Sequence, residues 1–188
     1  TILLGYYLII SINFLNSDLI NDLSFISSNF NLWVYSIFIL FIFNFFRKIF
    51  MGDSGAYTLG LLFSYIIIEY NNLSDQISPF FIVLLAWYPC YEILFSIIRK
   101  FKFGLSPIKA DNKHFHQLLF NFFSKKLNLK KIYINTFTGM VINTFNFIVI
   151  YLGFLEMNNT QYQILLILFS IILYTFLYLK LFSFRYKF

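Results

Sequence analysis

The sequence predicts an all-α fold: a polytopic membrane helix bundle with six transmembrane helices, forming a single domain over residues 1–188. Of the 188 residues, 60% are hydrophobic and only 12% are charged, which is too apolar for a soluble domain of this length. Uncharged runs also recur along the chain, each close to the ~20 residues that a helix needs to cross ~30 Å of hydrocarbon. Composition and run length together therefore predict that the chain lies in a bilayer.

The six predicted spans share this apolar character and cover residues 1–15, 32–46, 56–70, 79–98, 132–155 and 161–182. Pro89 interrupts the fourth span, where it removes a backbone hydrogen bond and predicts a kink. The last two spans contain no charged residue except Lys180 near the end, and we interpret them as bundle scaffold. Cys90 is the only cysteine, which excludes a disulfide framework and a cysteine-based metal site.

The fourteen Lys and Arg residues are confined to alternate connections, at 47–48, 99–131 and 180–187. The connections between them carry acidic residues instead, so the positive-inside rule predicts that residues 47–55, residues 99–131 and the C-terminus are cytoplasmic. This topology explains the net charge of +6, and nucleic acid is not needed as a partner. We interpret the basic cluster 125–131 as a contact with anionic lipid headgroups rather than with a substrate.

The stretch 49–60, IFMGDSGAYTLG, places a lone carboxylate between two glycines at the start of the third span. Gly52 and Gly55 allow a tight turn and a close approach of the backbone to a ligand. The positive end of the helix that follows would point back at this turn, where a phosphate or a hydrated cation would fit. In the alternative interpretation, Asp53 or Ser54 is only the N-cap of that helix.

The connection 99–131 contains both histidines of the chain, His114 and His116. Two residues apart, they would diverge on a helix but share one side of an extended or turning segment. A zinc site would need a third or fourth ligand, and only Asp111 is near. A phosphate site fits better, because histidines donate hydrogen bonds or exchange protons near neutral pH. Three cations in the same connection would add positive charge to it: Arg99, Lys100 and Lys102.

Glu92 is an ionisable residue within the fourth apolar run. A charge at that depth is a candidate functional residue by default, paired with another group or facing a cavity. Arg99 follows seven residues later and therefore lies on the same helical face about two turns away. A structural pairing with Arg99 and a functional role both remain open.

Two of these stretches resemble motifs of one family. IFMGDSGAYTLG is similar to the MGDSGS-type motif of the polyprenyl-phosphate N-acetylhexosamine-1-phosphate transferases. Residues 104–119, GLSPIKADNKHFHQLL, resemble the G-x-SP-x-x-x-D-x-x-H-x-H-x-LL segment of the same family. The resemblance covers residues 43–119 in detail and the remaining helices only by pattern. Lys100 and Gln117 stand where the family often has an arginine and a third histidine.

The resemblance implies a role for each matching position. Asp53 would be a catalytic residue and a ligand of Mg²⁺, with Mn²⁺ as an alternative ion, and His114 and His116 would be catalytic. Phe50 would stack on the uracil unless it is only a structural residue, as most of the 28 Phe side chains would be. Asn44 would contact the nucleotide unless it only bonds the backbone at its helix end. The remaining positions that would bind substrate are these: Gly52, Ser54, Arg99, Lys100, Lys102 and Asp111.

The function implied is transfer of N-acetylhexosamine-1-phosphate from a UDP-sugar to polyprenyl (undecaprenyl) phosphate, at the start of cell-envelope polysaccharide synthesis. The partners would be UDP-N-acetylhexosamine, the polyprenyl phosphate lipid and the cell (inner) membrane, and a homodimer is compatible with the pattern. Because the family's aspartate pair and its N-x-x-N-x-x-DG motif would lie upstream, we expect this chain to be the C-terminal part of a longer transferase and inactive alone. The alternatives are a transporter, with Glu92 and Asp53 lining an ion path, and a non-catalytic scaffold.

Overall fold

The computed structural model describes residues 30–46, 48–49, 52–73, 77–106 and 112–186, and every element in these ranges is a helix. The chain divides into two compact units, 1–77 and 78–188, and each is considered by itself. Among the described helices three are long and apolar enough to cross a membrane, all in the second unit. An all-α membrane bundle is thereby supported, whereas the predicted number of six spans is not confirmed.

The described part of the first unit contains α3 (Phe30–Phe45) and α4 (Gly52–Leu73), which match two of the predicted spans. The predicted span 1–15 lies outside the described residues. Helix α4 begins four residues earlier than predicted, at a Gly52 with a φ of 63° that glycine adopts without steric cost. The turn is therefore made at Gly52 itself, and the prediction that residues 52–55 precede the helix is wrong.

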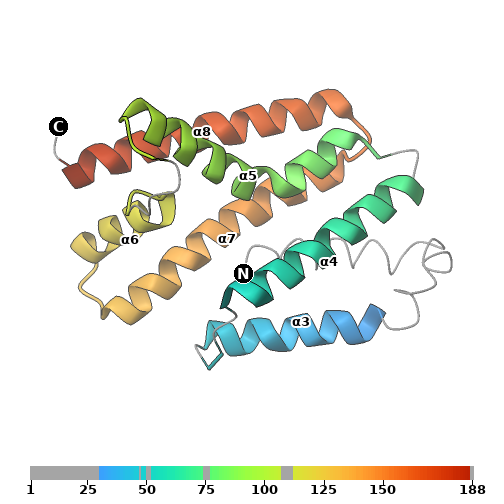
Figure 1. The fold of residues 1–188 in the computed structure, drawn as a ribbon, viewed down its shortest axis with the longest axis horizontal. Helices are drawn as coiled ribbons and strands as arrows, with labels where there is room; N and C mark the ends of the chain where they lie inside the picture. The colour runs from blue at the N-terminus through green and yellow to red at the C-terminus, as the bar shows by residue number, and fades with distance from the viewer. Residues whose placement is uncertain (1–29, 47, 50–51, 74–76, 107–111, 187–188) are drawn as a thin grey trace. The chain divides into compact units, whose positions relative to one another are not determined.

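The second unit contains α5 (Pro79–Lys102), α6 (Phe115–Lys126), α7 (Lys131–Leu155) and α8 (Thr160–Tyr186). Helix α5 packs against α7 and α8, α6 packs against the same two helices, and α7 packs against α8 (Figure 1). The three long helices confirm the predicted helices at 79–98, 132–155 and 161–182. Helix α5 continues through Pro89 to the end of the span.

Helix α6 corrects the interpretation of residues 99–131 as a loop. Its buried side chains are Phe115, Leu118 and Leu119, spaced as one face of a helix. The backbone N–H of His114 donates to the side-chain Oε1 of Gln117 at 3.2 Å, which secures the first turn. The sequence signal for this helix was the spacing of its apolar residues. It was missed because the segment is too short to span a membrane and is flanked by charged residues.

The start of α5 is tied to the connection between α7 and α8 around one serine. Ser78 is the N-cap of α5, and its hydroxyl accepts a hydrogen bond from the Phe80 N–H at 3.3 Å. The same hydroxyl lies 2.9 Å from the Thr160 hydroxyl, and the Ser78 N–H donates to the Met157 carbonyl at 3.0 Å. These bonds satisfy polar groups at one end of the bundle and fix where α5 begins.

The same end of the bundle contains a close crossing of α5, α7 and α8 at Gly153. The Nε2 of the fully buried Gln163 donates to the Gly153 carbonyl at 2.7 Å and to the Glu156 carbonyl at 2.9 Å. A Cβ added at Gly153 would lie 2.1 Å from the Leu84 Cδ2 and 3.0 Å from the Gln163 Oε1. Only glycine therefore fits this position. Gln163 adds a side-chain donor to two carbonyls that also accept backbone N–H bonds, Gly153 from Glu156 at 3.3 Å and Glu156 from Asn159 at 3.0 Å.

We expect Gly153→Ala to destabilise the protein by about 1–3 kcal/mol, because Leu84 is completely buried and has little room to move away from the new methyl group. Gly139→Ala is the matched control in the same helix, since a Cβ there meets nothing within 4 Å. Alanine also favours helix by up to ~1 kcal/mol over glycine, so the control is expected to be neutral or stabilising. Thermal unfolding in detergent measures both, and equal melting temperatures for the two variants would contradict the close crossing.

Candidate active site

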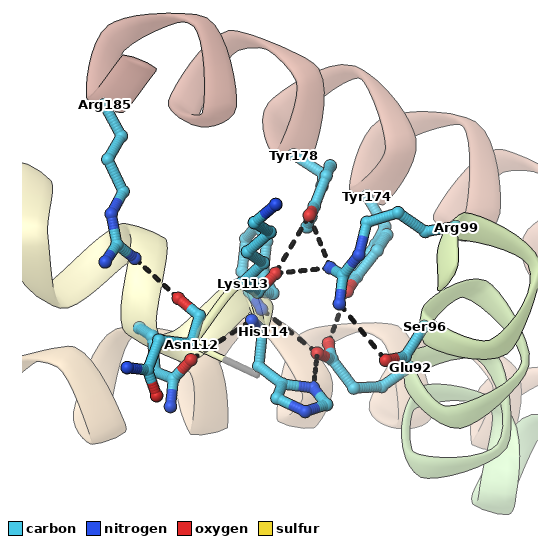
Figure 2. Close-up of polar contacts among 11 residues, drawn as sticks. Glu92, Ser96, Arg99, Asn112, Lys113, His114, Tyr174, Tyr178 and Arg185 are labelled. Atoms are coloured by element: carbon cyan, nitrogen blue, oxygen red, sulfur yellow. Dashed lines mark hydrogen bonds and ion pairs between the residues drawn. The ribbon is translucent and has the colours of Figure 1, made fainter. Parts of the chain in front are cut away.

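Residues 112–116 form the histidine segment, and Glu92 of α5 accepts hydrogen bonds from it (Figure 2). Its Oε1 accepts hydrogen bonds from the backbone N–H of Phe115 at 3.0 Å and from the Nδ1 of His114 at 3.1 Å. Its Oε2 accepts a hydrogen bond from the Tyr174 hydroxyl of α8. A carboxylate at the first N–H groups of α6 also interacts favourably with the positive end of that helix.

The contact with Glu92 fixes the tautomer of His114. An ionised carboxylate only accepts hydrogen bonds, so the proton of a neutral His114 ring is on Nδ1. The Nε2 of the same ring then carries a lone pair and can accept a hydrogen bond or a proton. Glu92 thus sets both the position and the chemistry of this histidine.

Arg99 holds the residue just before His114. Its buried guanidinium donates to the Lys113 carbonyl at 2.5 Å, to the Tyr178 hydroxyl at 2.5 Å and to the Ser96 hydroxyl at 3.2 Å. Tyr178 in turn donates to the same Lys113 carbonyl at 2.9 Å. Glu92 and Arg99, which the sequence offered as a possible ion pair, therefore contact successive residues of one segment. Arg99, predicted to bind substrate, lies in this structural contact.

The last turn of α8 contributes a further contact to the segment. Arg185 donates from NH1 to the Asn112 carbonyl at 2.6 Å (Figure 2). Side chains from α5 and α8 accordingly hold the backbone at residues 112, 113 and 115. Such repeated anchoring outside the helices fixes a polar segment that carries no regular hydrogen bonds of its own.

The two histidine rings lie on the same side of the segment. Their centroids are 5.9 Å apart and their planes differ by 14°. His114 has an extended backbone with φ −69° and ψ 151°, whereas His116 lies in the first turn of α6. The change of conformation between them brings side chains two residues apart into a stack, so both imidazoles can act on one ligand.

The pKa of His116 lies below its ordinary value of 6.5, chiefly because partial burial desolvates the charged ring. The Glu92 carboxylate opposes this by raising the pKa, and the neighbouring His114 lowers it further. Arg185 of α8 and the uncharged Asn135 of α7 line the pocket next to the ring. His116 is therefore mainly neutral near pH 7 and can both donate and accept.

The other predicted site residues fall into three groups. Lys102 is exposed and Lys100 is buried near the end of α5. Asn44 donates to the Ile49 carbonyl at 3.2 Å, the backbone contact considered as its alternative. Phe50 and Asp111 lie outside the described residues. Within the described ranges, no group of three or more His, Cys, Asp or Glu side chains could hold a metal ion.

The first motif occupies the start of α4. The backbone of Asp53 lies in its first turn, just after the positive-φ Gly52, and its side chain is outside what the structure describes. Ser54 is exposed in the same turn, and its carbonyl accepts a hydrogen bond from Thr58 at 2.9 Å. This motif belongs to the first unit and the histidine segment to the second, so each is described by itself.

Sequence reasoning missed the contribution of α8, which was interpreted as scaffold. Tyr174 and Tyr178 lie four residues apart and contact Glu92 and Arg99 respectively. Arg185 completes the set near the C-terminal end of the helix. The available signal was the four-residue spacing of tyrosines on one helical face, which a chain with 14 Tyr and 28 Phe obscures.

Fold and site together define a helical membrane protein whose polar histidine segment is folded against one end of its bundle. Over 73 residues the chain is 29% identical to the undecaprenyl-phosphate alpha-N-acetylglucosaminyl 1-phosphate transferases of Escherichia coli (strain K12) and Shigella flexneri. It is 27% identical to the protein of that name from Salmonella typhi over the same length. Each match covers 38% of this chain and 20% of the relative's length. The resemblance to this family is thereby confirmed as a distant and partial one.

No family model and no solved structure matches the chain.

We expect Glu92→Ala to weaken the start of α6, because it removes the acceptor of three hydrogen bonds. Losing one such bond costs about 1–3 kcal/mol, so amide exchange at residues 115–120 should accelerate by about tenfold or more. Glu92→Gln retains acceptor oxygen and should have a smaller effect. Exposed Glu156→Gln is the control, and unchanged exchange in Glu92→Ala would contradict the anchoring.

We expect the pKa of the His116 ring to lie below 6.5 in the wild-type protein. In Glu92→Gln the pKa of His116 should fall further, because the variant removes the carboxylate charge that raises this pKa. The chain has only two histidines, so NMR of the labelled rings gives two titrations, assigned with His114→Asn. Because the folded pKa lies below the unfolded one, the contribution of His116 to stability is present above pH 6.5 and lost as pH falls through the folded pKa. A His116 pKa above 6.5 would contradict the burial argument.

Proposed function

We propose that the chain takes part in transfer of N-acetylhexosamine-1-phosphate from a UDP-sugar to polyprenyl phosphate. The observation that carries the proposal is the stacked pair His114 and His116, with His114 oriented by a carboxylate and its segment anchored by Arg99. Two imidazoles held on one side of a segment suit a diphosphate, whose oxygens accept hydrogen bonds and whose departure needs charge compensation. The names of the partial relatives support the same class of reaction.

In the proposed reaction an oxygen of the lipid phosphate attacks the β-phosphorus of the UDP-sugar. The bond from that phosphorus to the bridging oxygen breaks, and UMP leaves with the electron pair. His116 would donate a hydrogen bond to a phosphate oxygen, and the Nε2 of His114 would accept and hold a proton there. Exposed Lys102, at the end of α5, would add positive charge for the substrate, while Arg99 keeps the segment in place.

Asp53 is the residue that would hold Mg²⁺, with Mn²⁺ as the alternative ion. Its position after Gly52 in the first turn of α4 fits a ligand only in part, because one carboxylate needs water and phosphate oxygens to complete the octahedron. When bound, the ion supplies charge neutralisation for the phosphates. Ser54 is exposed in the same turn and offers a hydroxyl to a substrate oxygen.

We expect the complete gene product in membranes to release UMP from UDP-N-acetylglucosamine when Mg²⁺ and undecaprenyl phosphate are present. Asp53→Asn should lower the rate by about hundredfold or more, because losing a metal ligand removes several kcal/mol of charge stabilisation. His116→Asn should lower it by at least about hundredfold, the usual size of a general acid–base contribution.

Glu156→Gln, an exposed carboxylate outside both motifs, is the control and should retain the parent rate. Activity equal to the parent in Asp53→Asn would show that Asp53 is not a metal ligand in the reaction. A parent that releases no UMP from any UDP-N-acetylhexosamine would favour the scaffold or transport interpretation instead.

A further inference from the structure

A pocket of about 420 Å³ lies beside His116, where α6, α7 and the last turn of α8 meet. Five of its lining residues carry an uncharged amide or imidazole: Asn112, His116, Gln117, Asn121 and Asn135. Phe120 adds an aromatic surface, and Arg185 adds a cation. The described lining therefore offers many hydrogen bonds and one positive charge.

The amides of this pocket have capacity to spare. Within the described residues, the side chains of Asn121 and Asn135 make no hydrogen bond, and Gln117 uses only its Oε1, which accepts from His114. An amide offers two donors and an acceptor at once, which matches hydroxyl groups better than it matches a bare anion. The lining therefore favours a ligand with several hydroxyls.

Arg185 gives the pocket its charge. One nitrogen of its guanidinium donates to the Asn112 carbonyl, which leaves the other N–H groups for a ligand. Two more cations lie against the same turn of α8. The Nζ of Lys113 is 5.6 Å from the centroid of the Tyr186 ring, and the Nζ of Lys125 is 5.3 Å from the centroid of the Phe184 ring. Among the described residues that line the pocket none is a carboxylate, so the charge around Arg185 favours an anion.

We propose that this pocket binds a hydroxyl-bearing phosphate ester, with Arg185 on the phosphate and the amides of Asn121 and Asn135 on the hydroxyls. One source of this chemistry is the phosphoglycerol headgroup of an anionic lipid. Helix α8 is long and apolar enough to cross a membrane, and Arg185 in its last turn lines the pocket. If α8 spans the bilayer, its end and this pocket would lie at the level of the headgroups. The other source is a soluble glycerol or sugar phosphate. The inference does not depend on the transferase proposal.

The test is native mass spectrometry of the purified complete protein with three lipids and one soluble ester. Phosphatidylglycerol supplies phosphate, net charge and hydroxyls, phosphatidylserine supplies charge without those hydroxyls, and phosphatidylcholine supplies neither. Glycerol 3-phosphate supplies the soluble form of the same chemistry. We expect phosphatidylglycerol to bind most tightly, and preferential binding of glycerol 3-phosphate would instead assign the pocket to a soluble ligand.

Two variants probe the two halves of the ligand. Arg185→Gln should weaken binding by about tenfold or more, as expected for one charge-assisted hydrogen bond. Asn135→Leu keeps the charge and the Asn112 contact, and it should weaken phosphatidylglycerol by about three- to tenfold while leaving phosphatidylserine unchanged.

Lys180→Gln is the matched control, because it removes one exposed positive charge from the same helix α8 outside the pocket and outside the basic cluster 125–131. It should bind phosphatidylglycerol as the parent does. Equal losses in Lys180→Gln and Arg185→Gln would show attraction to surface charge alone and would overturn the proposal. So would binding of every ligand that neither Arg185→Gln nor Asn135→Leu changes.

Discussion

The hydrogen bonds received by the Glu92 carboxylate are the constraint on which the second unit depends. A partly buried carboxylate is unfavourable unless donors surround it, and here the donors come from the His114 ring, the backbone of Phe115 and the Tyr174 hydroxyl. The partners belong to different helices, so the need to satisfy one charge brings the start of α6 against α5 and α8. The location of the histidines follows from this requirement and not from the local preference of a polar segment.

Helix α5 acts as a rigid support because two of its charged residues, Glu92 and Arg99, lie on one face. Glu92 and Arg99 are about two turns apart, and they contact neighbouring residues of a single extended strand of chain. Arg99 binds a carbonyl and Glu92 binds an N–H, so each charge meets the backbone group of opposite polarity. A segment held in this way loses little further freedom when it binds a ligand, which favours binding.

The long helices of the second unit could be predicted from the sequence, because an apolar run of that length has few other structures available in a bilayer. Helix α6 could not be distinguished from a loop, because it is short, buries only three side chains and is followed by lysines. Glu92 could be recognised as unusual by its depth, but its partner His114 is 22 residues away and is fixed by tertiary packing. The contact of Tyr174 with Glu92 could not be predicted either, because it is also fixed by tertiary packing and the chain is rich in aromatic residues. The roles of Asp53, Phe50 and Asp111 remain predictions from the resemblance.

The crossing at Gly153 has a consequence for how the protein is made. Gln163, at the start of α8, donates to the carbonyls of Gly153 and Glu156, which also accept backbone N–H bonds in the turn. The polar backbone at this bend is therefore satisfied by residues no more than 10 positions apart. Helices α7 and α8 with their connection therefore form a hairpin whose turn satisfies polar backbone groups from within the hairpin itself. Such a hairpin can enter the lipid as one piece during synthesis.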